Sequence, residues 1–162
     1  MDSNVAYIEN IIFLSKQNIA WDHVEKYLKS YIGKTYTVAE SEDVISIASD
    51  FPNEYAESKY TKRLRGSIAK AKANAAQVIG KMIVLAVNKR WVENKDEKHK
   101  KDAEKGWYRY DTYFAMPVQG SEEKEKRVNI FKATLVVRIS LKGLFLYDVI
   151  NIKKEASKPL ES

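Results

Sequence analysis

Residues 127–155, RVNIFKATLVVRISLKGLFLYDVINIKKE, decide the fold. Two apolar runs, at 127–140 and 144–155, are separated by the short turn LKG at 141–143. Runs rich in β-branched and aromatic residues that flank a glycine-containing turn are typical of paired strands. We therefore predict an antiparallel hairpin, because consecutive strands with a short connection pair with each other.

Further strands surround this hairpin in the sequence. The segment WYRYDTYFAMPV at 107–118 follows Gly106 and is expected to end as a strand at Pro117, because proline cannot continue the pairing. The polar segment QGSEEKEK at 119–126 then forms a turn. Two shorter runs, KTYTVAE at 34–40 and EDVISIAS at 42–49, predict two short strands with a tight turn between them.

Apolar residues at helical spacing predict helices in two other parts of the chain. Residues 1–33 are expected to hold two helices, the second ending at Gly33. The apolar stripes of these helices are Ile8, Ile11 and Ile12, then Trp21, Val24, Tyr27 and Leu28. A long helix is expected over 58–88, with a break near Gly80, and residues 90–105 are expected to be helix or loop. The long helix has the stripe Leu64, Ile68, Ala71, Ala75, Ile79, Met82 and Ala86.

Together these elements predict one α+β domain over residues 1–162. Residues 1–33 form a helical N-terminal segment, residues 34–155 the core, and residues 156–162 a frayed tail. In the core, the long helix packs on an antiparallel sheet of about four to five strands.

Charge is distributed unevenly along the chain, whose formal net charge is +6. Residues 1–57 carry a net charge of −6 and residues 58–162 a net charge of +12. Such asymmetry indicates a polyanionic partner such as nucleic acid, although lysine-rich helices are often simply solvated. One hypothesis is that the acidic third screens the basic surface as a regulatory segment, and the alternative is that its helices only complete the core.

The composition excludes several classes of site. There is no cysteine, so disulfides and thiolate-ligated metals are excluded, and the two histidines lie far apart, which disfavours zinc. No phosphate-binding glycine loop or nucleophile elbow is present. We expect no cofactor, no secretory leader, no membrane span and a cytoplasmic location.

The segment KHKKDAEKGWYRYD at 98–111 carries the candidate catalytic residues. RNA cleavage without a metal needs a proton acceptor, a proton donor and a cation for the developing phosphate charge. His99 titrates near neutral pH, Arg109 offers a planar fork for phosphate, and Asp111 follows two residues later on the same strand face. The alternative is that His99 lies on the surface and that Arg109 and Asp111 form an ordinary ion pair.

Other residues are candidates for nucleic-acid contact. Trp107 shares the strand face of Arg109 and could stack on a base. Lysine, asparagine and arginine side chains could reach the phosphate backbone from three places, the segment beside His99, the long helix and the hairpin. These candidates are Lys98 and Lys100, Lys70 and Asn74, and Arg138.

Asp148 lies on a strand that reads as apolar on both faces, so its carboxylate is expected to be buried and paired. Arg138, on the neighbouring strand of the hairpin, is the expected partner. This pair could be structural only, or it could anchor the cation that binds phosphate.

Three segments together resemble a known family: YTKRLRGSIAKAKANAAQ at 60–77, NKRWVENKDEKHKKDAEKGWYRYDTYFAMPV at 88–118 and LYDVINIKKE at 146–155. The chain resembles, over about residues 20–160, the domains attached to large polyvalent proteins of phages and conjugative elements, related to the C-terminal domain of MuF-type phage proteins. That family has been likened to the nuclease superfold of barnase, EndoU, colicin D and RelE toxins. The resemblance implies a helix-plus-sheet domain of a bacterial mobile element that could cleave RNA without a metal.

Three functions follow as hypotheses. The first is a nuclease-like domain that acts on RNA through His99, with Arg109 and Arg138 or Lys100 holding phosphate. The second is a non-catalytic module that binds nucleic acid or a protein. The third is a counter-defence or immunity protein of a mobile element, with a protein target.

Overall fold

The computed structural model describes residues 3–94, 105–119 and 126–160. Within them the helices are α1 (Trp21–Leu28), α2 (Phe51–Glu57), α3 (Lys59–Arg63), α4 (Gly66–Ala75) and α5 (Ile79–Val84), with the short 3-10 helices η1 (Lys29–Tyr31) and η2 (Ala76–Val78). The strands are β1 (Val5–Tyr7), β2 (Thr35–Thr37), β3 (Val44–Ser46), β4 (Val87–Val92), β5 (Trp107–Pro117), β6 (Arg127–Ser140) and β7 (Gly143–Pro159). The fold is therefore α+β, as predicted.

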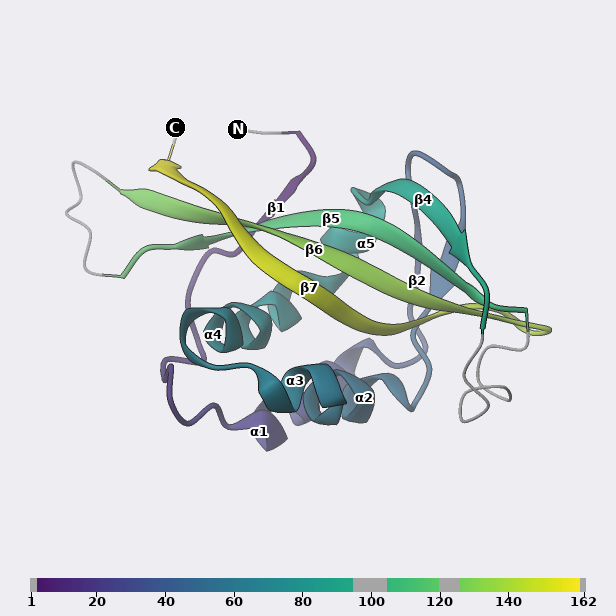
Figure 1. Cartoon of the computed structure of the whole chain (residues 1–162), viewed down its shortest axis with the longest axis horizontal. Helices are drawn as coiled ribbons and strands as arrows, with labels where there is room; N and C mark the ends of the chain where they lie inside the picture. Colours follow the sequence, from purple (N-terminus) through teal and green to yellow (C-terminus); the bar gives the residue numbers. More distant parts are fainter. Residues whose placement is uncertain (1–2, 95–104, 120–125, 161–162) are drawn as a thin grey trace.

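All seven strands belong to one strongly curled sheet (Figure 1). The strand order is β1-β5-β6-β7-β3-β2, and β4 pairs with the same edge of β5 as β1. The prediction of a purely antiparallel sheet of four to five strands is wrong, because β1 pairs with β5 and β3 pairs with β7 in parallel. These parallel pairs are only two or three residues long, so they leave no clear pattern in the sequence.

The central hairpin is confirmed. Strands β6 and β7 pair antiparallel from Ser140 opposite Gly143 to Arg127 opposite Pro159. Gly143 has φ +132°, a conformation that favours glycine, which explains the turn. β7 continues to Pro159, so residues 156–159, expected to be a frayed tail, are paired with β6 instead.

The first predicted helix is absent. Residues 5–7 form β1, and the chain then runs without helix to α1. The side chain of Asn74 in α4 takes the place of helical hydrogen bonds here, because its Oδ1 accepts from the backbone N–H groups of Ile12 and Phe13 at 2.9 and 3.1 Å. Tertiary contacts have overridden the helical spacing of Ile8, Ile11 and Ile12.

The predicted long helix is broken into α3, α4, η2 and α5. Ser58 is extended and caps α3 by accepting from the N–H of Thr61. Arg65 is extended and Gly66 has φ +62°, so the chain turns before α4. Residues 90–92, expected to be helix or loop, belong to strand β4 instead.

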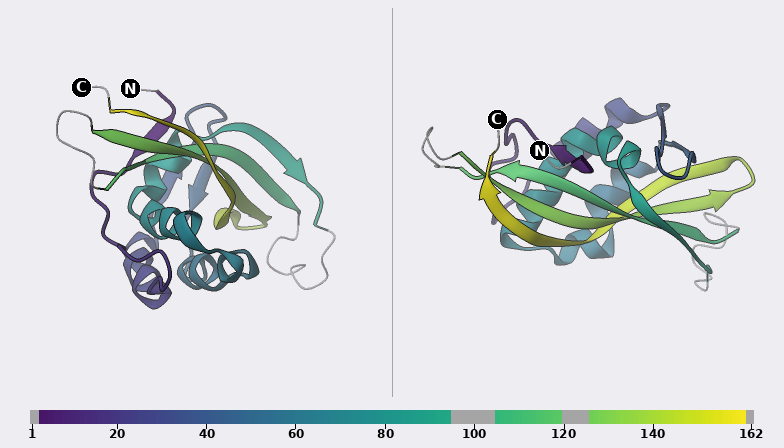
Figure 2. Two further views of the ribbon diagram at one scale, coloured as in Figure 1. Left: turned by 60° about the vertical axis from the view of Figure 1, so that its left-hand side comes forward. Right: turned by 90° about the horizontal axis from the view of Figure 1, so that it is seen from above.

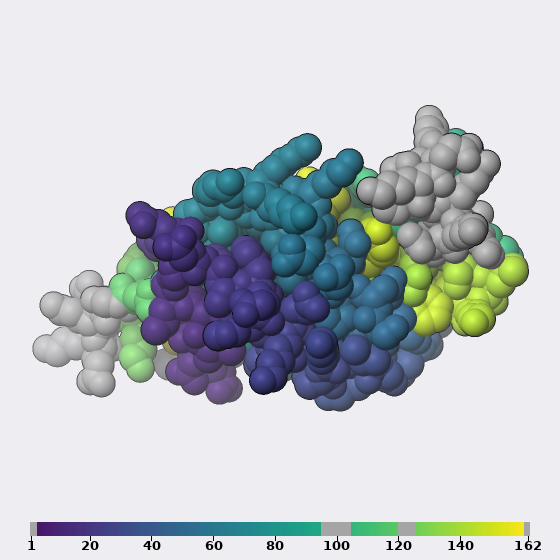
Figure 3. Space-filling view, turned by 90° about the horizontal axis from the view of Figure 1, so that it is seen from below, coloured from purple at the N-terminus to yellow at the C-terminus, as the bar shows by residue number. Residues whose placement is uncertain are grey.

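The helices lie on one side of the sheet (Figure 2). They bury alternate residues of the long strands, among them Tyr110, Phe114 and Leu135. Figure 3 shows this helical side, where the purple N-terminal segment lies beside the teal α4. Val24 and Leu28 of α1 are fully buried in the core, which agrees with a packing role for the acidic third. Among the described residues, no helix is long and apolar enough to cross a membrane.

Candidate nucleic-acid interface

Four residues form a row across strands β4 to β7. Arg90 pairs with Arg109, Arg109 with Val136, and Val136 with Asp148. Residues directly opposite each other in antiparallel strands project to the same face of the sheet. On β5 the intervening residue Tyr110 is buried against the helices, so Arg90, Arg109 and Val136 lie on the other face, which we call the open face, whereas the carboxylate of Asp148 turns at the edge of β7 toward Lys72 of α4.

A pocket of about 240 Å³ lies on the open face in the middle of this row. It is lined by Trp107, Arg109, Val136, Tyr147, Asp148 and Ile150, and we call it the Arg109 pocket. The rings of Trp107 and Tyr147 meet edge to face, with centroids 5.0 Å apart. The predicted common face of Trp107 and Arg109 is thus confirmed.

A β-bulge shapes this pocket. Val136 lies opposite Asp148, but the next residue, Val137, lies opposite Leu146, so Tyr147 is an extra residue in β7. A bulge of this kind re-aims a side chain relative to the regular strand. The extra residue is the one whose ring contacts Trp107.

Arg109 is the cation of the pocket. Its Nε atom is buried and has no hydrogen-bond partner. No ion pair among residues 3–94, 105–119 and 126–160 includes Arg109. A guanidinium offers donors in a fork that matches a phosphate group, so an anion in the pocket could satisfy this group.

Asp111 lies on the same face as Arg109 but is engaged by other residues. Its carboxylate accepts from Asn88 Nδ2 at 3.0 Å and pairs with Arg90 at 3.1 Å and Lys132 at 3.8 Å. Burial acts to raise the pKa of Asp111, but the Asn88 hydrogen bond and the charges of Arg90 and Lys132 hold it below its usual value. Asp111 is therefore held as an ionised carboxylate, paired with Arg90 rather than with Arg109.

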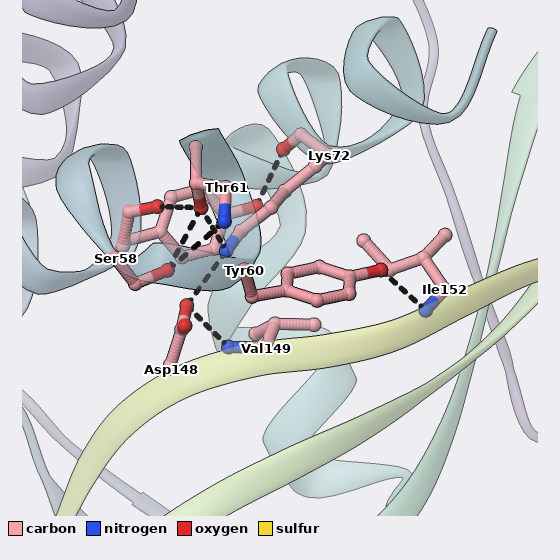
Figure 4. Close-up of polar contacts among 8 residues, drawn as sticks. Ser58, Tyr60, Thr61, Lys72, Asp148, Val149 and Ile152 are labelled. Atoms are coloured by element: carbon pink, nitrogen blue, oxygen red, sulfur yellow. Dashed lines mark hydrogen bonds and ion pairs between the residues drawn. The ribbon is translucent and has the colours of Figure 1, made fainter. Parts of the chain in front are cut away.

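Asp148 is buried as predicted, but its partner is Lys72 of α4 and not Arg138 (Figure 4). Lys72 Nζ lies 2.7 Å from Asp148 Oδ1 and donates to Thr61 Oγ1 at 2.6 Å. The rings of Tyr55 and Tyr60 lie 4.5 and 5.1 Å from the same ammonium. The helices reach Asp148 because β3 covers β7 only as far as Phe145.

Burial shifts both members of this pair toward their neutral forms. It raises the pKa of Asp148, although the charge and hydrogen bond of Lys72 oppose the shift. It lowers the pKa of Lys72, which Asp148 partly counteracts. Asp148 therefore lies at the side of the pocket, and its carboxylate takes up a proton more readily than that of an exposed aspartate.

Arg138 occupies a different position from the one predicted. It lies opposite Phe145, and its guanidinium is over the Phe145 ring at 4.7 Å. Its Nη2 atom pairs with Asp50 Oδ1 at 3.3 Å. The predicted Arg138–Asp148 pair is wrong, because Asp148 pairs with Lys72 and Arg138 pairs with Asp50 instead.

Lys70 and Asn74 share a helix face, as predicted, but both are buried. Lys70 donates to Gln119, and Asn74 binds the backbone of residues 12 and 13. Both side chains are thus engaged within the chain, and their phosphate contacts stay a prediction that this burial does not favour. His99, Lys98 and Lys100 lie outside the described residues.

The sequence did not reveal Lys72 and Tyr147 as site residues. Lys72 lies in the alanine-rich run AKAKANAA at 69–76. Alanine on all faces of this helix was the signal in the sequence that the helix is buried on all sides, its lysine included. The bulge that selects Tyr147 depends on the pairing of two strands, so no local pattern marks it.

A larger groove of about 610 Å³ lies on the helical side. Tyr7, Tyr27 and Tyr36 contribute to its walls, with Lys81 and Glu9 as its charged residues. One cation and one anion do not favour a polyanion, so this groove is not the better candidate for the predicted ligand.

Comparisons with models of protein families, with curated proteins and with solved structures find no match for this chain. The resemblance to the phage and conjugative-element domains therefore stays a prediction.

Proposed function

We propose that this protein binds single-stranded RNA on the open face of the sheet and cleaves it without a metal cofactor. The observation that carries the proposal is Arg109, whose partly buried guanidinium is without an ion-pair partner among the described residues and lines a pocket with two aromatic rings. Cations bind the phosphate backbone, and aromatic rings stack on unpaired bases.

The charge of the open face supports this proposal. Arg90 and Lys132 flank the row, with side chains exposed by 44 % and 34 %. Their charges are only partly neutralised by Asp111, which both share. With the net charge of +6, this arrangement favours attraction of an RNA chain over attraction of a neutral ligand.

The size of the pocket favours a single-stranded substrate. Its volume of about 240 Å³ suits one nucleotide rather than a duplex. Bases in single strands can be splayed out onto aromatic side chains, whereas bases in a helix remain stacked. From the resemblance alone, we also propose that the domain has the nuclease superfold and that a phage or conjugative element encodes it.

RNA binding is tested with a fluorescent single-stranded oligonucleotide at several salt concentrations. We expect log K to fall linearly with log salt. Arg109→Gln should weaken binding about 10- to 150-fold, since a hydrogen bond to a charged group contributes roughly 1.5–3 kcal/mol. It should also reduce the slope by about 0.7 for a single-stranded ligand. Arg63→Gln, at the exposed end of α3 on the helical side, makes the same charge change and should have little effect.

Cleavage is tested by incubating the protein with the same RNA in EDTA, with His99→Ala beside the wild type. Cleavage that survives chelation and disappears in His99→Ala supports the catalytic function. Binding without cleavage leaves a nucleic-acid-binding module, which is the alternative function. If the wild type does not bind RNA, or if Arg109→Gln binds as well as the wild type, the proposed site is wrong and a protein partner becomes the next hypothesis.

A further inference from the structure

The curled sheet does not close on itself. β1 and β2 stand at opposite ends of the strand order, and both pack against α5, which lies between them (Figure 1). The groove of about 610 Å³ lies at this gap, because β1, β2 and α5 all contribute to its walls. Its volume is within the range of about 300–1,000 Å³ that is usual for small-molecule sites. The gap therefore offers a binding site that is separate from the Arg109 pocket.

Three tyrosines line this groove, Tyr7 of β1, Tyr27 of α1 and Tyr36 of β2, and we call it the tyrosine groove. Their hydroxyl groups make no hydrogen bond to any residue that the structure describes. The core tyrosines whose hydroxyl groups do donate within the chain are Tyr31, Tyr55 and Tyr110. The tyrosine groove thus presents aromatic rings with free polar ends, and pairs of aromatic rings attract each other beyond the area that they bury.

The position of the Tyr36 ring depends on a glycine. Gly80 lies in α5, although glycine is a poor helix former. A Cβ atom at residue 80 would lie 2.8 Å from Cζ of Tyr36, too close for two non-bonded carbon atoms. The Tyr36 ring therefore packs directly on the helix backbone and forms a wall of the groove. The fold thus includes a helix-weakening residue at the place where this wall requires it.

Two opposite charges line the same groove. Glu9 and Lys81 are both exposed. Within residues 3–94, 105–119 and 126–160, neither of them takes part in an ion pair. A polyanion would be repelled by Glu9, and a purely apolar ligand would use neither charge. A ligand with one ammonium group and one carboxylate group matches both charges.

We infer that the tyrosine groove binds a short peptide that has aromatic side chains and free amino and carboxyl ends. The peptide rings pack against the groove tyrosines, its ammonium group faces Glu9, and its carboxylate faces Lys81. A volume more than twice that of the Arg109 pocket suits a ligand of two or three residues rather than a single amino acid. This inference does not rest on the proposed function, because the tyrosine groove lies on the helical side of the sheet.

The test titrates the full chain with the dipeptide phenylalanylphenylalanine. Calorimetry gives the Kd, and NMR of labelled tyrosine rings locates the site. The ring signals of Tyr7, Tyr27 and Tyr36 should shift, while that of Tyr113, which packs in a separate cluster, should not. Alanylalanine has no rings and should bind about tenfold more weakly or less. Absence of any shift at about 10 mM dipeptide, tenfold above a weak Kd of about 1 mM, would overturn the inference.

Blocked forms of the dipeptide assign the two charges. N-acetylation removes the ammonium group and amidation removes the carboxylate, and each should weaken binding about 1.5- to 5-fold, the effect of an exposed ion pair. Lys81→Gln should weaken binding of the free dipeptide by a similar factor but leave the affinity for the amide unchanged. Glu9→Gln should show the same relationship with the acetylated form. Lys153→Gln and Glu155→Gln, in an exposed pair on β7, make the same charge changes and should have no effect.

Two further variants test the wall of the groove. Gly80→Ala should displace the Tyr36 ring, and Tyr36→Leu removes that ring, so both should weaken binding of all forms of the dipeptide. If folded protein with either change binds like the wild type, the ligand lies elsewhere and the inference is wrong.

The ligand comparisons can overturn the inference in two more ways. Equal affinity for the free and both blocked dipeptides would show that the charges take no part. Equal affinity for alanylalanine would show that the rings take no part. None of these results alters the effect expected of Arg109→Gln on RNA binding, so the inference and the proposed function fail separately.

Discussion

Lys72 Nζ lies 2.7 Å from Asp148 Oδ1, and the two side chains are exposed by only 0 % and 5 %. This ion pair joins α4 to β7 just beyond the point where β3 ceases to cover that strand. A buried pair of this kind is weak evidence for stabilisation, because desolvation opposes the attraction, but loss of one partner is severe. The pair therefore couples the helical layer to the wall of the Arg109 pocket.

Lys72→Met alone should reduce the free energy of unfolding by about 3–5 kcal/mol, because it leaves an uncompensated buried carboxylate. Lys72→Met with Asp148→Leu should reduce it by much less than the sum of the two single changes. Urea denaturation of the four proteins in this cycle measures the difference. Lys153→Met removes a lysine from the exposed Lys153–Glu155 pair and should change stability by only about 0–1 kcal/mol. Additive effects of the two buried changes would contradict the pairing.

Asp43 should make stability dependent on acid pH. Its carboxylate accepts from Tyr110 Oη at 2.7 Å and Ser41 Oγ at 2.8 Å and pairs with Lys89 at 2.8 Å. Burial acts to raise its pKa, but the hydrogen bonds from Lys89, Tyr110 and Ser41 lower it below the ordinary value of 3.8. A lowered folded-state pKa adds stability above pH 3.8, and this contribution is lost as the pH falls through the folded-state value.

Asp43→Asn should therefore be less stable than the wild type at pH 7, by roughly 1.5–3 kcal/mol if the charged hydrogen bonds are lost. The difference should shrink as the pH falls below 3.8, because the wild-type carboxyl is then also neutral. Urea denaturation at pH 7, 5, 4 and 3 measures the effect, with pH values chosen on both sides of the ordinary aspartate pKa. A constant difference at all four pH values would show that Asp43 does not titrate with folding.

Gly106 directly precedes Trp107 of the candidate site and has φ +98°. A Cβ atom there would lie 2.9 Å from the backbone oxygen of Val92, whereas a Cβ at Gly33, which has φ +89°, meets nothing within 4 Å. Gly33→Ala should be destabilised by backbone strain alone, about 1–3 kcal/mol. Gly106→Ala adds a backbone clash and should lose more stability in thermal unfolding. Equal losses of stability in the two variants would mean that β4 and β5 can move apart at Gly106 and avoid the clash without further destabilisation.

The open face could be predicted in part from the sequence. The period of two in a strand placed Trp107, Arg109 and Asp111 on one face, and the structure has them so. The hairpin at 127–155 was also clear, because apolar runs and a glycine turn are local signals. The ion-pair partner of each charged residue could not be predicted. Asp148 pairs with Lys72 because α4 packs against β7 near the bulge, and this contact joins residues 76 positions apart in the sequence.

The N-terminal segment shows why periodicity can fail. Ile8, Ile11 and Ile12 have helical spacing, but Ile8 is buried next to β5, and its N–H donates to Ala115 O at 2.9 Å. Isolated short helices are marginal in water, so packing partners decide the conformation. Here the decisive partners, β5 and Asn74, come roughly 60–110 residues later in the chain.

Asn74 should be required for the path of this N-terminal segment. Its side chain is fully buried, accepts from the N–H groups of Ile12 and Phe13, and donates to Phe13 O at 2.9 Å. Asn74→Ala removes these three bonds and should cost about 1–3 kcal/mol for polar groups left unsatisfied. Hydrogen exchange should become faster at the amides of Ile12 and Phe13, while the amides of β6 stay protected. Ser30→Ala, which removes one exposed hydrogen bond to Tyr27 O, is the control and should have a smaller effect. Unchanged exchange at Ile12 and Phe13 in Asn74→Ala would mean that packing of Ile11 and Phe13 against the core, and not the amide, holds the segment in place.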